Sequence, residues 1–591
     1  MINKHLLLIL TIILLLLTST INLTAIQINP ETNHKFNRLQ PLVIQNLGNI
    51  LYVDDDNTNG PWDGTINHPY QYIQDAIQAA QSHDHIYVFN GTYYENLHIK
   101  KTLTLEGESN QHTIIDGNYI SNVISITAPN VTLARFTIQN SGITQPDAAL
   151  LITKQHTIII ENNIYHNNHG ILINTPNNAI IYNNFEDNKN HAYTQMNNTI
   201  TYNYWDNTNK NDQNEDGICD IPYQIPGDNI TDPFPLIHRY GSITNKNTQN
   251  IFFNIQSAID DVTTQPYHII KLKPDIYHEH LIIKKPLIIQ GTSPSTTIID
   301  GSHQNTTIYL QTNDTTITQL TIQNSGTNQI DTGIQITGHN NTITKNRIIE
   351  NYIGIKLSHA QNTILTHNQI THNNWVGLII NHHSHKTLIH DNSFQSNLYA
   401  GIGINTSHDN KIYHNDFINH QHHAYDDSYN TWDNDLPTGG NYWDDYTGND
   451  TDYNFIGDDP YPIKGGINQD RYPLMYPQHQ YDTTPPTIKI TKPTNGLYIR
   501  ERHILSRLLQ KTIIIGKITI NAKANDAESG IIHVKFYLNN QPYPEKTDNQ
   551  PPFEWRWENG EFPPDIHQIK VVAYNGAGLE SFDKIEVKRY L

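Results

Sequence analysis

The chain of 591 residues has 37 Lys and Arg against 57 Asp and Glu, a formal net charge of -20. This charge argues against a nucleic-acid-binding protein, because phosphates attract a basic surface. Charged residues make up 16% and hydrophobic residues 36%, so the polarity comes from uncharged side chains interspersed with Ile, Tyr and Leu, as in a folded chain. The single cysteine, Cys219, excludes an intrachain disulfide and a thiolate metal cluster.

Residues 1–25 have the order of a secretory signal peptide: a charge at Lys4, an apolar run over 6–17 and then small polar residues. Ile21 and Leu23 lengthen the apolar stretch toward a membrane span, so an uncleaved anchor is the alternative. Residues 26–49 are expected to be a linker. Since no second hydrophobic segment follows, the bulk of the chain is expected outside the membrane, secreted or on the cell surface.

A first module is predicted over residues 50–240, and it opens with a short helix. Apolar residues recur at i, i+3, i+4 and i+7, the spacing of one helix face, at Ile73, Ala76, Ile77 and Ala80. Because a stack of coils exposes unpaired edges at its ends, we interpret this helix as a cap.

A short repeat follows the cap, in which Asn162-Asn-Ile-Tyr-His-Asn167 returns as Asn183-Asn-Phe-Glu-Asp-Asn188. A period of about 22 residues fits a leucine-rich repeat or a coil of a parallel β-helix. Short alternating segments rich in β-branched Ile and Thr favour the β-helix. Asparagines at one place in successive coils would stack at about 4.8 Å and bond from coil to coil, so we expect them to be structural.

One loop of this module has the oxygen-rich pattern of a Ca²⁺ site. Positions 1, 3, 5 and 9 carry oxygen ligands and position 6 is a glycine that permits a sharp turn. Position 12, where a bidentate Glu is expected, is Tyr223. A polar turn satisfied by its own backbone is the alternative. The predicted ligands are Asp212, Asn214, Asp216 and Asp220.

A second module is predicted over residues 241–478, because the first is repeated there. Thr113-Ile-Ile-Asp-Gly117 returns as Thr297-Ile-Ile-Asp-Gly301 at an offset of 184, whereas Asn203-Tyr-Trp-Asp206 returns as Asn441-Tyr-Trp-Asp444 at an offset of 238. The excess of 54 residues predicts about two additional coils and a loop. A second cap helix is predicted from Ile255, Ala258, Ile259 and Val262.

The second module has the clearer short period, in Asn346-Arg-Ile-Ile-Glu-Asn351, Asn368-Gln-Ile-Thr-His-Asn373 and Asn392-Ser-Phe-Gln-Ser-Asn397. Glycines keep the same interval at Gly354, Gly377 and Gly401. The counterpart of the Ca²⁺ loop offers Asp450, Asp452, Asn454 and Asp458, with Phe455 in place of the glycine.

Histidines also cluster in this module, and imidazole is a ligand for copper or zinc. The segments are His382-His-Ser-His385 and His420-Gln-His-His423, with His367 and His414 at equivalent places of different coils. With 33 histidines in the chain, clustering by chance is the favoured account, and a specific transition-metal site is the alternative.

The composition changes after the second module. Residues 479–486 are expected to be a Pro-rich linker, and residues 487–591 a small all-β domain. Four alternating segments predict its strands: Thr487-Ile-Lys-Ile-Thr491, Lys517-Ile-Thr-Ile-Asn521, His533-Val-Lys-Phe-Tyr-Leu538 and Gln568-Ile-Lys-Val-Val-Ala573. A basic insertion from Arg500 to Lys511 is expected to be a loop or short helix.

These features together resemble NosD-type right-handed parallel β-helix proteins, common on archaeal cell surfaces. The resemblance rests on Tyr52-Val-Asp-Asp-Asp56, Gly91-Thr-Tyr-Tyr-Glu95, the Asn-x-Ile coils and the Asn-Tyr-Trp terminus. The last domain resembles bacterial-type Ig-like domains through Pro551-Pro-Phe-Glu-Trp555 and Val572-Ala-Tyr-Asn-Gly-Ala-Gly578. The resemblance implies two tandem pectin-lyase-like solenoids followed by an Ig-like β-sandwich, and it implies a link to copper-enzyme maturation.

The fold does not by itself specify an activity. A polysaccharide lyase or glycoside hydrolase of this fold needs a proton-abstracting base with a cation site, or two carboxylates flanking the bond. The paired Asp426-Asp427 lacks the Gly-His-Gly and Arg-Ile-Lys companions of a polygalacturonase-like site.

We therefore favour a non-catalytic surface protein that binds a polysaccharide or glycoprotein surface, mediates adhesion or associates with a surface layer. Carbohydrate-active enzyme and copper handling are the alternatives. The sequence predicts structural Ca²⁺, no nucleic acid, membrane contact at most through the N-terminal segment, and no particular oligomeric state. Sequons expected of a glycoprotein include Asn90-Gly-Thr92, Asn130-Val-Thr132 and Asn340-Asn-Thr342.

Overall fold

The computed structural model describes residues 48–590 except 228, 453, 478–484, 507–510, 527–530, 540, 549–552, 558–564 and 576–578. The predicted signal peptide and most of both predicted linkers lie outside the described residues. Two compact units are present: one holds the described residues up to Leu281 with Lys285–Ile298, and the other holds Ile282–Lys284 with everything from Ile299 onward. None of the described helices has the length and apolar character needed to cross a membrane.

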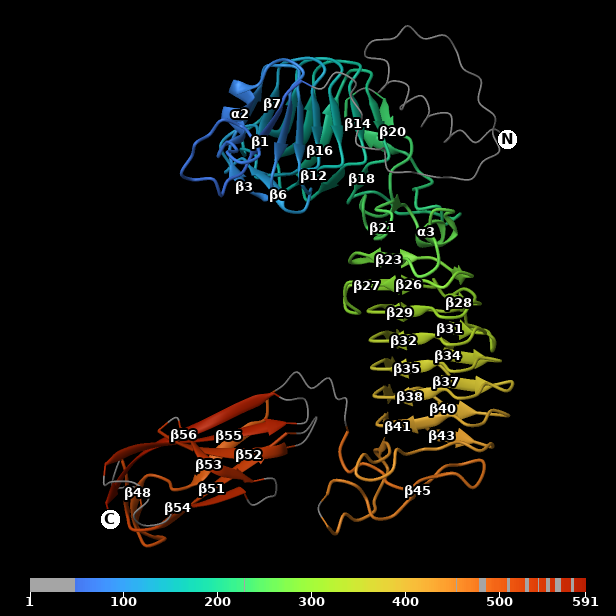
Figure 1. The fold of residues 1–591 in the computed structure, drawn as a ribbon, viewed down its shortest axis with the longest axis vertical. Helices are drawn as coiled ribbons and strands as arrows, with labels where there is room; N and C mark the ends of the chain where they lie inside the picture. Colours follow the sequence, from blue (N-terminus) through green and yellow to red (C-terminus); the bar gives the residue numbers. More distant parts are fainter. Residues whose placement is uncertain are drawn as a thin grey trace. The chain divides into compact units, whose positions relative to one another are not determined.

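The first module is a parallel β-helix, in which each coil adds one strand to three sheets in turn (Figure 1). The first sheet contains β1 (Ile50–Val53), β2 (His85–Val88), β5 (Thr104–Gly107), β8 (Thr132–Ala134), β11 (Ile158–Ile160), β14 (Ala179–Ile181) and β17 (Thr199–Thr201). The second contains β3 (Gly91–Tyr94), β6 (Thr113–Asp116), β9 (Thr137–Gln139), β12 (Asn163–Tyr165), β15 (Asn184–Glu186) and β18 (Tyr204–Trp205). The third contains β4 (Leu97–Ile99), β7 (Ile124–Ile126), β10 (Ala148–Ile152), β13 (His169–Ile173) and β16 (Asn190–Thr194).

Apolar side chains stack in register inside these coils. Alternation along each strand points every second residue inward, and parallel pairing places like residues above one another. In the first sheet the buried column is Leu105, Leu133, Ile159, Ile180 and Ile200. Burial of such columns is the main stabilising term, because a single coil has no core of its own.

Helix α2 (Ile73–Ala79) covers the open end of the first module, as predicted. Its face Ile73, Ala76 and Ile77 is buried. Glu95 accepts hydrogen bonds from the free backbone N–H groups of Ile73 and Gln74, at 2.7 and 2.9 Å. At the other end, the Lys101 ammonium donates to carbonyls of the last turn. Both helix ends are thus satisfied by side chains.

The first unit ends with the opening of the second module. A hairpin of β19 (Tyr223–Ile225) and β20 (Ile230–Asp232) closes the first module. The second opens with β21 (Ile243–Asn245), β22 (Ile251–Phe252), helix α3 (Ile255–Asp260), β23 (Ile269–Leu272), β24 (Asp275–His278) and β26 (Ile288–Gln290). Helix α3 confirms the second predicted cap, although Val262 lies beyond it and is exposed.

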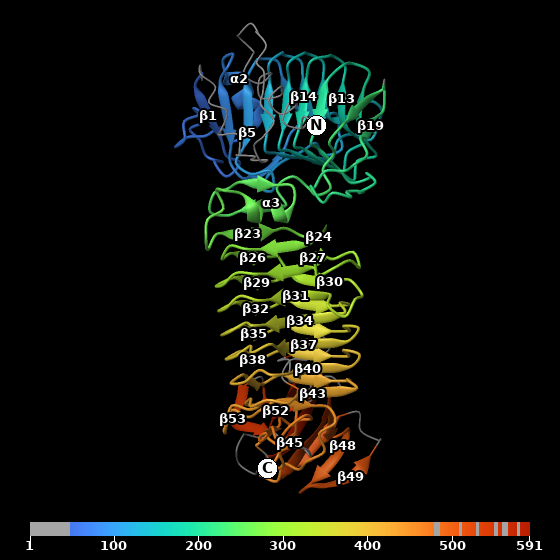
Figure 2. The ribbon, with the colours of Figure 1, turned by 90° about the vertical axis from the view of Figure 1, so that its right-hand side faces the viewer.

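The second unit contains the later coils of the second module, which follow the same three-sheet order (Figure 2). First-sheet strands are β29 (Thr316–Thr318), β32 (Thr342–Thr344), β35 (Ile364–Thr366), β38 (Leu388–His390) and β41 (Lys411–Tyr413). Second-sheet strands are β30 (Thr321–Gln323), β33 (Arg347–Ile349), β36 (Gln369–Thr371), β39 (Ser393–Gln395), β42 (Asp416–Ile418) and β44 (Tyr442–Trp443). Third-sheet strands are β28 (Ile308–Leu310), β31 (Thr332–Ile336), β34 (Ile353–Ser358), β37 (Val376–Asn381), β40 (Ala400–Ile404) and β43 (His422–Asp426), and a bridge of β45 (Tyr461–Pro462) with β46 (Gln469–Asp470) follows.

Buried asparagines form ladders at the corners between sheets. In each step a side-chain amide donates to the amide oxygen of the next coil, at 2.9 to 3.2 Å. One ladder contains Asn346, Asn368, Asn392, Asn415 and Asn441. It ends on the buried carboxylate of Asp470, which accepts from Asn441 and from the Trp443 indole. The predicted structural role of the asparagines is confirmed.

The C-terminal domain is an all-β sandwich, and all four predicted strands are present. One sheet contains β47 (Thr487–Lys492), β51 (Ile518–Asn525) and β54 (Phe553–Trp557). The other contains β49 (Arg502–Ser506), β48 (Gly496–Ile499), β50 (Thr512–Ile515), β56 (Glu580–Tyr590), β55 (Ile566–Asn575), β52 (Ile531–Leu538) and β53 (Gln541–Asp548). The loop or helix predicted for the basic insertion is wrong in part, because residues 502–506 form an edge strand paired with β48.

Candidate functional site

The loop predicted to bind Ca²⁺ in the first module is held by its own backbone. Asp212 accepts from the amides of Asp216 and Gly217, at 3.2 and 2.9 Å, and Asp216 accepts from Ile218 at 2.9 Å. Asp220 accepts from the amide of Gln213, and the Asn214 oxygen accepts from that of Asp216. Burial raises the pKa of Asp212, and Asp216 and Asp220 add to this. The loop brings its acidic residues near one another, but their oxygens face backbone amides.

The equivalent loop of the second module repeats this pattern. Asp450 accepts from the amides of Asn454 and Phe455, Asp452 accepts from Asn454, and Asp458 accepts from Thr451. Phe455 takes the positive φ of 69° that Gly217 takes at 82° in the first loop. The same Asx-type turn therefore forms without the glycine.

Among the predicted histidine ligands, His420 is part of an asparagine ladder. Its Nδ1 accepts from the amide of Asn397 at 3.1 Å, and its Nε2–H donates to the carbonyl of Phe394 at 3.1 Å. These are the bonds that an Asn makes at this corner, as Asn397 itself does with Asn373 and Ile370. Burial lowers the pKa of His420 to about 4. Both ring nitrogens of His420 are used in these hydrogen bonds, so the ring has no free nitrogen for a metal ion.

The remaining histidine segments line two other corners. His385 and His408 stack with ring centroids 3.9 Å apart, and His359 stacks on His382 at 5.4 Å. Burial, followed by the neighbouring imidazoles, lowers the pKa of His385. Within the described residues, these rings do not bring three metal-ligand atoms together.

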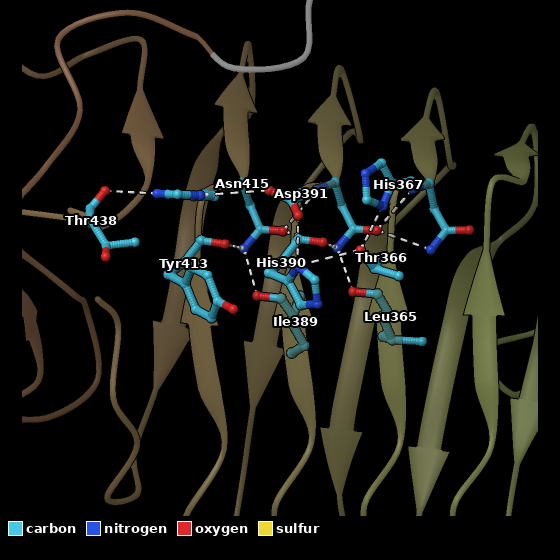
Figure 3. Close-up of polar contacts among 12 residues, drawn as sticks. Leu365, Thr366, His367, Ile389, His390, Asp391, Tyr413, Asn415 and Thr438 are labelled. Carbon is cyan, nitrogen blue, oxygen red and sulfur yellow. Dashed lines mark hydrogen bonds and ion pairs between the residues drawn. The ribbon is translucent and has the colours of Figure 1, made fainter. Parts of the chain in front are cut away.

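His367 and His414 do lie at equivalent turn positions, because both take a positive φ, as Asp391 does in the coil between them. Figure 3 shows His367 and Asp391 on neighbouring coils. Asp391 contacts the His390 ring at 2.7 Å and the His414 ring at 3.6 Å. The other nitrogen of His414 donates to the carbonyl of Thr438 at 2.7 Å. The bond to Asp391 raises the pKa of His414. The arrangement ties the segment after the last coil to the stack.

In the pair Asp426-Asp427, the carboxylate of Asp426 is held by hydrogen-bond donors. Asp426 is fully buried and accepts from the indole of Trp432, the amide of Ser428 and the side chains of Asn430 and Asn468. Such a carboxylate is a structural acceptor, since every partner on it is a donor.

A row of aromatic side chains marks the corner between the second and third sheets of the second module. Tyr352, Trp375 and Tyr399 each precede a third-sheet strand, in consecutive coils, and we call them the aromatic row. Ring centroids lie 5.9 Å apart between Tyr352 and Trp375 and 6.3 Å apart between Trp375 and Tyr399. His422 extends the row, at 5.1 Å from Tyr399.

Two members of the row, Tyr352 and Trp375, pack on a separate apolar cluster formed by Ile353, Val376, Ile379 and Ala400. Next to it, the outward column of the third sheet runs through Lys356, Ile379, Gly403 and Tyr425. A Cβ atom added at Gly403 would meet no atom within 4 Å. The surface therefore combines rings, an apolar floor and an open notch.

Neither the row nor the notch was found from the sequence alone. The signal was present, because each aromatic stands two residues before the regularly spaced glycines Gly354, Gly377 and Gly401. The prediction used the spacing of the glycines and asparagines and did not use the aromatic residues.

The equivalent corner of the first module is polar. The residues preceding its third-sheet strands are Asp147, Asn168 and Lys189; Asn168 stands where the second module has Tyr352, whereas Asp147 is matched by Asp331. A groove of about 600 Å³ lies there, and its lining includes Tyr119, Ile143 and the His166–Asp187 ion pair at 3.4 Å. The two modules thus differ in chemistry at matching positions of the same fold.

Comparisons with known proteins agree with this architecture. Residues 288–448 match the family of periplasmic copper-binding proteins named NosD, and residues 486–571 match the bacterial Ig domain. The chain thus combines a NosD-type β-helix with an Ig-like domain, as the sequence predicted. The comparison with curated proteins finds no match.

Three solved structures illustrate the likeness. The fibronectin(III)-like modules of Clostridium thermocellum CbhA are 20% identical with a TM-score of 0.14, covering 20% of this chain and 52% of that one. The A-module of the Azotobacter vinelandii mannuronan C-5 epimerase AlgE6 is 12% identical with a TM-score of 0.19, covering 61% and 91%. Pectate lyase Pel9A is 12% identical with a TM-score of 0.21, covering 67% and 82%. Alignments this loose say nothing about what this chain binds.

The described residues do not fit a soft-ligand copper site. Cu(I) is selected by thiolate and thioether ligands, and Cys219 is buried with its thiol donating to the carbonyl of Asn209. Among the described residues, the corners of His359, His382, His385 and His408 gather no three ligand atoms, and the one such group, His423 with Asp444 and Asp445, lacks a sulfur ligand.

Proposed function

We propose that this protein is a secreted or cell-surface β-helix protein that binds polysaccharide without cleaving it. The aromatic row carries the proposal. Aromatic rings offer large apolar faces against which sugar rings pack, and their polar tips can bond to hydroxyl groups. The partner is a polysaccharide or a glycoprotein surface, and adhesion or surface-layer association follows from such binding.

The geometry of the row favours an extended ligand. Successive coils of a β-helix lie about 4.8 Å apart, so the row presents rings at a regular interval along the stack. Trp375 and Tyr352 rest on a packed apolar floor, so little conformational entropy is lost when a ligand orders them. A linear polymer can use several rings at once, which raises its affinity over that of a monosaccharide.

The open notch at Gly403 gives a direct test. Gly403→Val fills the notch with a residue suited to a strand, and no neighbouring atom lies within 4 Å of the new Cβ. We expect the variant to bind a panel of immobilised neutral and acidic glycans roughly tenfold more weakly, with an unchanged or higher melting temperature. If the variant and the wild type bound the glycans equally, the ligand would not contact the notch at Gly403.

The same panel separates binding from catalysis. Soluble products released from a bound glycan, and abolished by a single carboxylate or Lys substitution, would make the protein a lyase or hydrolase. We expect no release under conditions in which binding is measurable.

We also infer that Ca²⁺ supports the loop of Asp212, Asn214, Asp216 and Asp220, and less strongly that of Asp450, Asp452, Asn454 and Asp458. The support is the concentration of carboxylates in one tight turn, which a hard cation would neutralise. Ca²⁺ is expected to raise the melting temperature of the wild type but not of Asp216→Ala. A melting temperature independent of Ca²⁺ in both would remove this proposal.

A further inference from the structure

The ends of the two modules are built from the same parts. Trp205 stacks between Phe185 and Tyr223 at 4.3 Å on each side. Trp443 stacks in the same way between Phe417 and Tyr461, also at 4.3 Å. These stacks close the apolar core at the last coil, where no further coil covers it.

The residue after each tryptophan is an aspartate that bonds back to a buried histidine. The His191 Nε2 lies 2.8 Å from Asp206, and the His423 Nε2 lies 2.8 Å from Asp444. The other oxygen of each aspartate accepts a backbone N–H at 2.6 Å, from Asp187 in the first module and from Asn419 in the second. This second bond fixes the orientation of each carboxylate.

In the first module the histidine has partners on both ring nitrogens. The Asn188 side-chain amide donates to Nδ1 of His191 at 3.3 Å, so Nε2 carries the proton that is donated to Asp206. Burial lowers the pKa of His191. This histidine is a neutral structural group with no lone pair directed at the carboxylate.

Two substitutions change this arrangement in the second module. His420 stands where the first module has Asn188, and its ring bonds are used within the ladder. The Nδ1 of His423 is therefore buried without a hydrogen-bond partner, although only 6% of the side chain is exposed. Asp445 stands where the first module has Asn207, and it lies 3.3 Å from Nε2 of His423.

We propose that His423, Asp444 and Asp445 form a binding site for a divalent transition-metal ion, with Zn²⁺ as the ion used to test it. One imidazole nitrogen and two carboxylate oxygens lie within 4.8 Å of one another. Three such ligands with a water in the fourth position satisfy tetrahedral zinc. Ca²⁺ and Mg²⁺ take oxygen ligands, so the imidazole disfavours them.

The surroundings suit a metal that enters from solvent. Asp444 and Asp445 are 30% and 58% exposed, whereas the histidine is buried. The Tyr461 hydroxyl bonds to Asp445, and Asn419 holds Asp444, so both carboxylates are oriented by neighbours. The ion would link strand β43 to the segment after β44 and so lock the end of the second module.

Titration of the metal-free full chain with ZnCl₂ tests this site. We expect one tight site in the wild type and a Zn²⁺-dependent rise in melting temperature. Asp445→Asn restores the amide that the first module has, and it is expected to weaken this site roughly tenfold or more and to remove the rise. Because Asp445 is largely exposed, the variant should fold.

Two further variants test whether other histidines account for the Zn²⁺ binding. Asp187→Asn removes an exposed carboxylate beside His166 and is expected to leave the tight site intact. His420→Asn restores a donor to Nδ1 of His423, which places the proton on Nε2, and it is expected to weaken Zn²⁺ binding. Tight binding that survives Asp445→Asn unchanged, or a tight site lost equally in Asp187→Asn, would overturn the proposal.

Discussion

Buried asparagine is the residue on which the stack depends, because each side chain serves three coils at once. Asn392 donates to the carbonyl of Leu365 and to the side chain of Asn415, and it accepts from the backbone and side chain of Asn368. Every polar atom of the side chain is used in a site closed to water.

Removing one asparagine of a ladder should therefore reduce the free energy of unfolding more than a surface substitution does. Asn392→Ala leaves several buried donors and acceptors without partners, and we expect a loss of about 2 to 4 kcal/mol in stability. Denaturant unfolding monitored by tryptophan fluorescence measures it. Asn374→Ala, an exposed asparagine on a neighbouring coil, is the control and should change stability little. Equal effects of the two would show that the ladder bonds contribute nothing.

His420 provides a pH test of the same ladder. Its pKa is about 4 in the folded chain against 6.5 for an ordinary histidine. Between these values the unfolded state takes up a proton that the folded state does not, so stability falls as the pH falls from about 6.5 to about 4. His420→Asn keeps the bonds without titrating, and its melting temperature should fall less over this range.

The comparison is made in chelator, so that metal does not contribute. The difference between wild type and variant reports the titration of His420 together with the change that the new amide makes at its neighbour His423. Identical pH profiles would mean that the His420 ring is already charged or already solvated in the folded protein.

At the scale of single residues, the sequence predicts which positions repeat from coil to coil better than it predicts what each side chain binds. Asparagine recurring at a coil interval allowed the ladders to be predicted. His420 was considered as a copper or zinc ligand, with clustering by chance as the favoured account. Its place in a ladder was missed because an imidazole can replace an amide, with one nitrogen accepting and the other donating, and only the neighbouring backbone reveals this. His423 was named with it, but Asp444 and Asp445 come from the following coil and could not be associated with it.

At the scale of elements, short cap helices are stabilised by residues distant in sequence. Helix α2 has seven residues, too few to be stable alone. The repeat of Glu95 and Lys101 as Glu279 and Lys285 was visible in the sequence, and the structure supplies the reason. In both modules the glutamate accepts from the first turn and the lysine donates to carbonyls at or just beyond the end.

Lys101→Met should loosen the helix without removing apolar contact. The variant loses donors to the carbonyls of Gln78 and Ala80, at 2.6 and 2.7 Å. We expect hydrogen exchange at the amides of Ala76 and Ala80 to quicken roughly 5- to 30-fold, the effect of about 1 to 2 kcal/mol in local opening.

Lys100→Met is the matched control, because Lys100 is exposed and adjacent in sequence. Exchange that is as slow in Lys101→Met as in Lys100→Met would show that the ammonium group does not hold the helix end.

Element types were largely predictable, and element ends were not. Cap helices, coil strands and four strands of the sandwich follow from periodicity, which reports burial. Val262 fits the helical spacing but lies beyond the end of α3, where the chain has already turned. The edge strand over 502–506 opens with Arg502, and residues 502–504 are exposed, so alternation gave no signal for it.

At the scale of the whole molecule, duplication kept the caps and ends and changed the surface between them. Over the described residues, the second sheet has six strands in the first module and eight in the second, and the third sheet has five and seven. This confirms the two additional coils predicted from the unequal offsets. The residues that face the core are similar in the two modules, whereas the residues at the corner that carries the aromatic row differ.

Function is less predictable than fold here because it depends on outward residues, which no periodicity constrains. The aromatic row and the notch use side chains from consecutive coils about 23 residues apart, each unremarkable singly. Their meaning comes from the register that stacks them, and register follows only from the folded coils.

Glycan affinity of the full chain, compared between the wild type and Trp375→Ala, tests the proposed function most directly. Tyr193→Ala is the control, because it removes a partly exposed aromatic from the third sheet of the first module. We expect a ligand in the glycan panel whose binding weakens at least about tenfold in Trp375→Ala and stays unchanged in Tyr193→Ala. Glycan binding that is equal in all three proteins would contradict it.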